Sequence, residues 1–221
     1  MQAVGSLRVS DTTSEGSASS RAYEHVRRAI IRGELPGGTA ISENALCREI
    51  GVSRTPVHEA FLRLAAEELI VLGARRGAVV RPMSPNEAAD VLEMREAIES
   101  TAATRVVTDG RVPDLAPGLQ AVLLEQESAV ADGDVDRFVE SDAAFHGAVI
   151  AASRNAIAVL FARTLRDRQQ RLRHQLMRLR PEQLQASLDD HRALAAALEA
   201  GDAARYAAVL RAHVASHRGA L

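Results

Sequence analysis

The residues of this 221-residue chain that could do chemistry include an aspartate and a histidine on one apolar helical stripe. Asp142 and His146 are four residues apart, so they lie one above the other on the helix expected from Asp134 to about Ala152. The apolar residues around them indicate that this face is buried, and a buried carboxylate needs a partner. A metal ion would satisfy both the carboxylate and the imidazole one turn on.

Two later helices carry histidines on stripes of the same kind. His191 lies in the stripe Leu184, Leu188, Ala195 and Leu198, and His213 lies in the stripe Tyr206, Leu210 and Val214. Because such stripes face the core, three histidines and one aspartate could converge. The alternative for each is an ordinary polar side chain that finds a partner in the core. His217, four residues after His213, remains a substitute ligand.

The elements that position these residues are predicted to be helices. Aromatic residues make up only 3% of the chain, while Ala, Leu and Arg dominate, so good helix formers must build the core. After Ser84-Pro85 the pattern is helical almost to the end, with breaks that delimit six helices of about 15 to 25 residues. Short connections between helices of this length favour an antiparallel bundle.

The first third of the chain has a different pattern. Residues 1–20 are rich in Ser, Thr and Gly and are expected to form a flexible arm. Helices are predicted at about 21–33, at 43–50 between Ser42 and Gly51, and from a Ser53 cap to about Glu68. Residues 69–72 and 78–81, joined by the turn 73–77, read as a hairpin. Three helices followed by a hairpin is the order of a winged helix-turn-helix.

The third of these helices is a candidate for reading DNA. On a helical wheel Arg54, Thr55 and His58 project from the side opposite the apolar residues, near the helix start. Arg76 and Gly77 at the hairpin tip suit a wing, since a small residue lets the backbone approach DNA and the guanidinium can reach a phosphate. The alternative is a solvated polar helix face.

Charge and composition point the same way. Residues 21–82 hold ten Arg against seven Glu, whereas residues 83–221 hold sixteen Arg against twenty acids, so a polyanionic partner would meet the first part.

The single cysteine, Cys47, excludes an internal disulfide framework. No run approaches 18 apolar residues and no secretory signal is evident, so a cytoplasmic protein without a membrane partner is expected.

The stretch ISENALCREIGVSRTPVHEAFLRLAAEELIVLGARRGAVVRP closely resembles the winged helix-turn-helix of the GntR family of bacterial transcription regulators. The resemblance covers about residues 21–82 and implies that Ser53, Arg54, Thr55 and Gly77 stand at positions that meet DNA. His58 replaces a usual Arg, Asn44 stands where some members are basic, and Glu68 replaces a common Gly. The family implies a homodimer on a double-stranded DNA operator.

The remainder resembles the FadR-like C-terminal domain found in one GntR subgroup, through VLEMREAIE, SDAAFH and DDHRALAAALEAGDAARYAAVLRAH. That resemblance implies that Asp142, His146, His191 and His213 bind a divalent metal ion, with zinc as first choice and nickel or manganese as alternatives. It also implies a pocket for a small carboxylate effector above the metal. Arg95 is expected to contact the anionic group of that effector.

The sequence therefore predicts a mainly α protein with an arm (1–20), a winged helix-turn-helix (21–82) and a helical effector- and metal-binding domain (83–221). Its predicted function is transcription regulation rather than catalysis. A metal-dependent hydrolase or oxygenase, or a regulator that senses the metal itself, are the alternatives. A run of six arginines on one long helix is expected to form a solvated or oligomer-contacting face: Arg166, Arg168, Arg171, Arg173, Arg178 and Arg180.

Overall fold

The computed structural model describes residues 17–73 and 77–218. Arg76 and residues 1–16 of the predicted arm therefore lie outside the described residues. The chain divides into two compact units. One contains the described residues as far as Arg27 together with Ala40–Val79, and the other contains Arg28–Thr39 and the described residues from Val80 onward.

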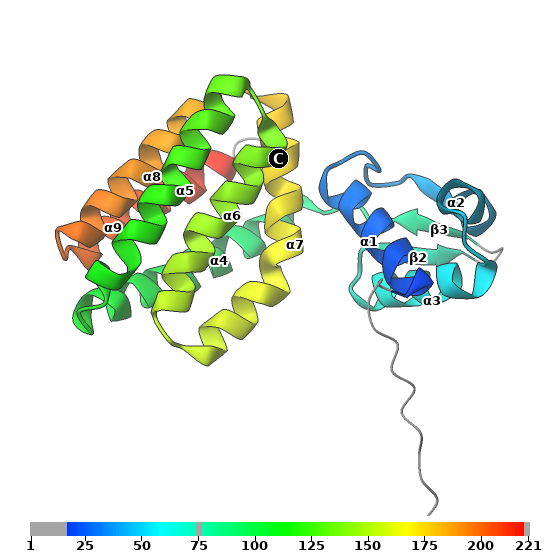
Figure 1. Cartoon of the computed structure of the whole chain (residues 1–221), viewed down its shortest axis with the longest axis horizontal. Coiled ribbons are helices and arrows are strands. Elements are labelled where there is room, and N and C mark those ends of the chain that lie inside the picture. Colours follow the sequence, from blue (N-terminus) through cyan, green and yellow to red (C-terminus); the bar gives the residue numbers. More distant parts are fainter. Residues whose placement is uncertain (1–16, 74–76, 219–221) are drawn as a thin grey trace, which may run out of the picture. The chain divides into compact units, whose positions relative to one another are not determined.

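The N-terminal elements follow the predicted helix-helix-helix-hairpin order, with one extra strand (Figure 1). They are α1 (Ala18–Ile31), β1 (Ala40–Ser42), α2 (Glu43–Ile50), α3 (Arg54–Ala66), β2 (Ile70–Gly73) and β3 (Gly77–Val80). Strand β3 lies between β1 and β2, and β1 pairs antiparallel with it so that Ala40 is opposite Val79. The sequence did not predict β1, because three residues are too few to show an alternating pattern.

The ends of these helices explain their lengths. The Ser42 hydroxyl accepts from the backbone N–H of Ala45, and Gly51 ends α2 in the left-handed region at φ 67°. Ser53 is the N-cap residue of α3, as predicted, although its side chain accepts no capping hydrogen bond from the described residues. Glu68 has φ 59°, a conformation that glycine adopts without strain, which agrees with the Gly that the GntR resemblance implies at this position.

Six helices make up the C-terminal bundle, as predicted, among the residues that the structure describes (Figure 1). They are α4 (Pro85–Thr108), α5 (Val112–Asp132), α6 (Val135–Ala152), α7 (Ala156–Leu179), α8 (Gln183–Glu199) and α9 (Ala203–Arg218). Helix α6 packs against α5, α7 and α4, while α9 packs against α4 and α8. The predicted fold class, a winged helix-turn-helix followed by a helical bundle, is confirmed.

The predicted apolar stripes form the cores. Val57, Phe61 and Leu64 of α3 are fully buried, which leaves the opposite side of that helix to solvent. In the bundle, Phe138, Phe145 and Tyr206 are among the largest fully buried side chains. Among the described helices, none combines the length and apolar character that crossing a bilayer requires.

Candidate functional site

The structure brings together the four residues predicted to bind metal. One potential ligand atom from each of Asp142, His146, His191 and His213 lies within 4.8 Å of the others. Helix α6 supplies the first two, α8 the third and α9 the fourth. All four are at most 5% exposed, so water can satisfy these polar groups only poorly.

Each of the three imidazoles is oriented by an oxygen acceptor at its Nδ1 atom. The pairs are His146 with Oε1 of Glu99 at 2.6 Å, His191 with Oε1 of Gln126 at 2.7 Å, and His213 with Oδ2 of Asp190 at 3.0 Å. An acceptor at Nδ1 keeps the proton there, so a neutral ring presents its Nε2 lone pair to the cluster. Acceptors of this kind typically orient histidines that bind metals.

The inner nitrogens meet in an arrangement that suits a cation. Nε2 of His146 lies 3.1 Å from Nε2 of His191, and that second nitrogen lies 3.0 Å from Oδ1 of Asp142. Two neutral imidazoles held in this way direct lone pairs at each other, which is favourable only with a positive charge nearby. Three imidazole nitrogens and a carboxylate oxygen are ligands that zinc and related divalent ions accept, so the donor set fits such an ion.

The charges of the cluster follow from burial and neighbours. Burial would raise the pKa of Asp142, but Arg173, His146 and Arg95 together hold that pKa well below its usual range. Burial lowers the pKa of His191 to about 4, so this imidazole is neutral at pH 7. An ionised carboxylate beside a neutral imidazole is the protonation state that a metal site needs.

Two buried arginines approach the cluster. Arg173 of α7 forms an ion pair with Oδ1 of Asp142, and its Nη2 lies 2.7 Å from Nε2 of His213. In Arg95 of α4, Nη2 lies 3.7 Å from Oδ2 of Asp142, and Nε lies 3.8 Å from Oε2 of Glu99. Burial also lowers the pKa of Arg173 to about 9. Because Arg173 is only 3% exposed, the predicted solvated or oligomer-contacting role of its arginine run is wrong at this position.

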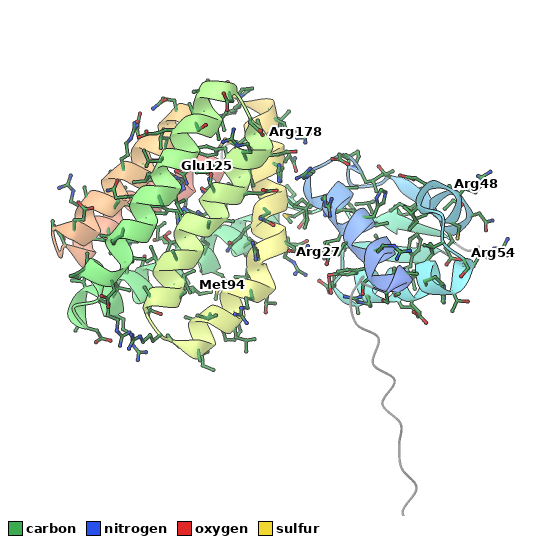
Figure 2. All side chains as sticks on the ribbon, viewed as in Figure 1. Arg27, Arg48, Arg54, Met94, Glu125 and Arg178 are labelled. Atoms are coloured by element: carbon green, nitrogen blue, oxygen red, sulfur yellow. The ribbon has the colours of Figure 1, made fainter. Side chains whose placement is uncertain are left out.

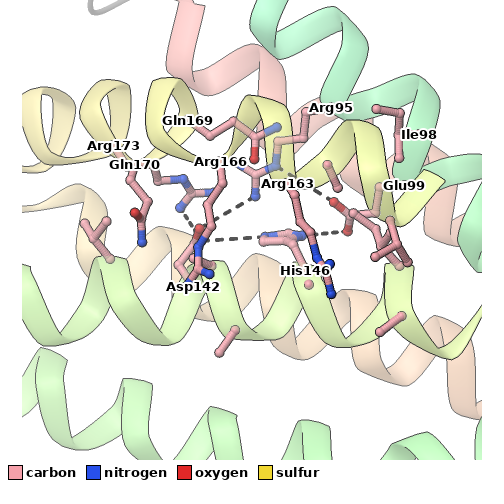
Figure 3. A pocket seen from close by; sticks show the side chains of 18 residues that line it. Arg95, Ile98, Glu99, Asp142, His146, Arg163, Arg166, Gln169, Gln170 and Arg173 are labelled. Atoms are coloured by element: carbon pink, nitrogen blue, oxygen red, sulfur yellow. Dashed lines mark hydrogen bonds and ion pairs between the residues drawn. The ribbon is translucent and has the colours of Figure 1, made fainter. Parts of the chain in front are cut away.

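A cavity of about 330 Å³ opens beside the cluster between α4, α6 and α7 (Figure 3). Arg95, Asp142, His146 and Arg173 line its inner part. Arg163, Arg166, Gln169 and Gln170 line it from α7, and Figure 3 shows the two arginines extending from that helix toward α6. Apolar walls with a few convergent charged groups are typical of small-molecule sites.

Sequence reasoning missed Glu99, Gln126, Tyr206 and Arg173 as parts of this site. Oε1 of Glu99 accepts from both His146 and Tyr206, the second contact at 2.5 Å. A signal existed for Glu99, Gln126 and Tyr206, since each carries a polar group but falls on an apolar stripe of its helix, whereas Arg173 stands in a strongly charged stretch. Gln126, for example, follows Leu119 and Leu123 at helical spacing.

The predicted DNA-reading residues lie on the first unit. Arg54, Thr55 and His58 of α3 are exposed, as is Asn44 of α2. Figure 2 shows Arg54 pointing outward from the start of α3. Together with Gly77, the three α3 residues line a shallow groove. The side chains of this surface are therefore accessible to a partner.

Glu43 is an acidic residue of this surface that the sequence did not single out. Its Oε1 lies 2.9 Å from Nδ1 of His58, and the carboxylate is largely buried whereas His58 is exposed. This contact orients the imidazole of His58, which stands where the GntR resemblance implies an arginine. An acid beside the groove reduces its positive charge and therefore its attraction for phosphates.

Comparisons with known proteins agree with both halves of the structure. Residues 18–80 match the model of bacterial regulatory proteins of the gntR family, and residues 90–216 match the FCD domain. The solved structure of E. coli McbR/YncC has the same fold, with a TM-score of 0.77 at 22% identity over 91% of this chain and 95% of that one.

Relatives in sequence are also transcription regulators. An HTH-type transcriptional regulator of Agrobacterium vitis is 29% identical over 145 residues, which cover 65% of this chain and 85% of that protein. The gluconate operon transcriptional repressor of Bacillus subtilis is 35% identical over 131 residues, covering 59% of this chain and 53% of the repressor. The chain thus spans about half the length of several relatives that it matches. The chain belongs to the GntR family of bacterial regulatory proteins and carries an FCD domain behind its DNA-binding domain.

Proposed function

We propose that this protein is a sequence-specific transcription regulator whose affinity for its operator is controlled by a small organic acid bound beside a divalent metal ion. It acts as a homodimer, which places two winged helices on an operator with two half-sites. As a bacterial regulator of transcription it is expected to work in the cytoplasm. The observation that carries this proposal is the buried cluster at the base of a cationic cavity.

The DNA-binding part of the proposal rests on α3. Arg54, Thr55 and His58 lie on the exposed side of this helix, near the end that enters a major groove in winged-helix proteins. Arginine can contact guanine edges or phosphates, and threonine can contact phosphates or base edges. Ser53, Asn44 and the wing residues Arg76 and Gly77 complete the proposed contacts.

The metal part rests on the ligand set. Asp142, His146, His191 and His213 each have a potential ligand atom within 4.8 Å of the others, and oxygen acceptors at Nδ1 orient the three imidazoles. Zinc is the first choice for such ligands, and nickel or manganese are alternatives. A divalent ion bound there supplies positive charge that attracts a carboxylate.

The chemistry of the effector follows from the charges of the cavity. Four arginines line the cavity: Arg95, Arg163, Arg166 and Arg173. The two carboxylates that line it, those of Asp142 and Glu99, already have partners within the cluster. An anion is therefore the favoured ligand. Arg95 reaches the cavity beside Asp142, so it is the proposed contact for the carboxylate. One relative is named for a gluconate operon, which makes sugar acids the first class to test.

The competing interpretation as a metal-dependent enzyme needs a general base beside the metal. Glu99 is the carboxylate other than Asp142 among the described residues that line the cavity, and its Oε1 already accepts from His146 and Tyr206. A regulator that senses only the metal would not need a cavity with four arginines. The winged helix adds a domain that hydrolysis would not use.

Calorimetry tests the effector site. Sugar acids including gluconate, hydroxy acids and dicarboxylates are titrated into zinc-loaded protein and into chelator-treated protein. One class is expected to bind the loaded protein only, and Arg95→Ala should weaken this binding without lowering the metal content. Equal binding after chelation would contradict a role for the metal in holding the effector.

A further inference from the structure

Arg173 makes contacts that cannot all persist when a metal ion binds to the proposed ligands. From α7 its guanidinium reaches Asp142 on α6 and His213 on α9, with Nη2 2.7 Å from Nε2 of the histidine. One buried side chain therefore engages two of the four proposed ligands. Arg95, the other buried arginine, approaches Asp142 only through its second oxygen.

His213 has one lone pair to offer. Its Nδ1 faces Asp190 at 3.0 Å and carries the proton, so Nε2 is the acceptor for Arg173. An imidazole nitrogen has a single lone pair in the ring plane, which can accept a guanidinium proton or bind a metal ion but cannot do both. Asp142 is less restricted, because a carboxylate oxygen can contact more than one cation.

We propose that Arg173 and the divalent ion compete for His213, and that Arg173, once released, binds the carboxylate of the effector. This inference rests on the proposed function and adds a residue and a regulation to the same site. Arg173 already lines the cavity, and its buried Nε has no hydrogen-bond partner among the described residues. A buried guanidinium that loses an acceptor gains most from a new anion.

The consequence is positive coupling between the metal and the anion. Each ligand favours the same position of Arg173, away from His213 and toward the cavity. By linkage, the anion must then strengthen metal binding by the same factor as the metal strengthens anion binding. Arg173 thereby lowers the affinity of the site for the metal ion when no anion is bound.

Zinc titration of chelator-stripped protein separates competition from simple repulsion between positive charges. Arg173→Met should bind zinc about tenfold more tightly than the wild type or better, because no hydrogen bond to a charged group has to be broken. Arg95→Met removes a second buried charge beside Asp142, but no contact between Arg95 and an imidazole is among its contacts with the described residues, so its gain in zinc affinity should be smaller than that of Arg173→Met. Arg178→Met on the exposed side of the same helix is the matched control (Figure 2).

Acetate serves as the probe anion. Acetate should tighten zinc binding to the wild type more than to Arg173→Met, which keeps Arg95 but lacks the released guanidinium. Two results would overturn the inference while leaving the metal centre intact. One is an equal gain in zinc affinity for Arg173→Met and Arg95→Met, and the other is an equal response to acetate in the wild type and in Arg173→Met. Zinc binding that is absent from the wild type, or unchanged by His213→Ala, would overturn the proposed metal centre as well.

A measurement on the wild type avoids dependence on the folding of the variant. In ¹⁵N spectra, zinc should shift the Nε2 signal of His213 and change the guanidinium signals of Arg173. Acetate should then change the Arg173 signals again. Arg173 signals that do not respond to zinc would show that the guanidinium stays on His213, and competition would be excluded.

Discussion

The Nδ1 atom of His146 lies 2.6 Å from Oε1 of Glu99, and both side chains are buried in the bundle. Burial would raise the pKa of Glu99, but His146, Arg95 and Tyr206 together lower it, so the carboxylate is ionised at pH 7. An ionised acceptor keeps the His146 proton on Nδ1 and leaves Nε2 available to the cluster.

Glu99→Gln should therefore lower metal affinity by about tenfold or more, because removal of an acceptor behind a histidine ligand typically has effects of this size. Zinc titration measures the change. Glu96→Gln is the control on the same helix, since Glu96 pairs with Arg211 and does not line the cavity. Equal affinities of the Glu99→Gln and Glu96→Gln variants would mean that Glu99 does not support the site.

Each of the proposed ligands should be necessary for a full metal content of about one ion per chain. Asp142→Ala, His146→Ala, His191→Ala and His213→Ala should each lower that content in elemental analysis of purified protein. His25→Ala should not, because His25 is partly exposed and pairs with Glu49 in the other unit. A full content in His191→Ala or His213→Ala would contradict a site built from three helices.

Arg54→Ala should weaken operator binding by about 1–3 kcal/mol, the range for a good arginine contact to a base. Its helicity and metal content should stay unchanged, since Arg54 is exposed at the start of α3. Fluorescence anisotropy on the DNA upstream of the protein's own reading frame measures the loss, with Arg105→Ala in the bundle as control. Unchanged affinity would remove α3 as the recognition helix, while an equal loss on all sequences would make Arg54 a phosphate contact.

Much of this arrangement could be predicted from the sequence because helical periodicity is strong here. The stripes of α6, α8 and α9 placed Asp142, His146, His191 and His213 on buried faces, and all four are buried. Periodicity says that a residue faces the core, but it does not say which other helix it meets. The family resemblance supplied that information for the ligands.

The missed features are those that tertiary packing decides. Arg173 stands in a strongly charged stretch, so its neighbours in sequence indicated solvent, yet Leu172, Leu176 and Met177 place its side of α7 in the core. Glu99 and Gln126 become meaningful only when α4 and α5 meet the histidines. The positive φ of Glu68 likewise depends on the turn from α3 into β2.

Tyr206→Phe tests how much the buried network contributes to stability. The hydroxyl donates to Oε1 of Glu99 at 2.5 Å, and its loss leaves a fully buried carboxylate with one partner fewer. The free energy of unfolding should fall by about 1–3 kcal/mol, since a buried charged acceptor loses a hydrogen bond. Denaturant unfolding of metal-free protein measures it, and an unchanged midpoint and slope would show that Tyr206 acts only by packing.

The central claim is that the metal and an organic acid together control DNA binding, and anisotropy on operator DNA tests it most directly. The acid that binds best in calorimetry is added to zinc-loaded and to chelator-treated protein at one salt concentration. The account predicts that operator affinity changes about five- to 150-fold in the loaded protein and not after chelation. The same change in both preparations, or no change in the loaded protein while the acid is bound, would contradict it.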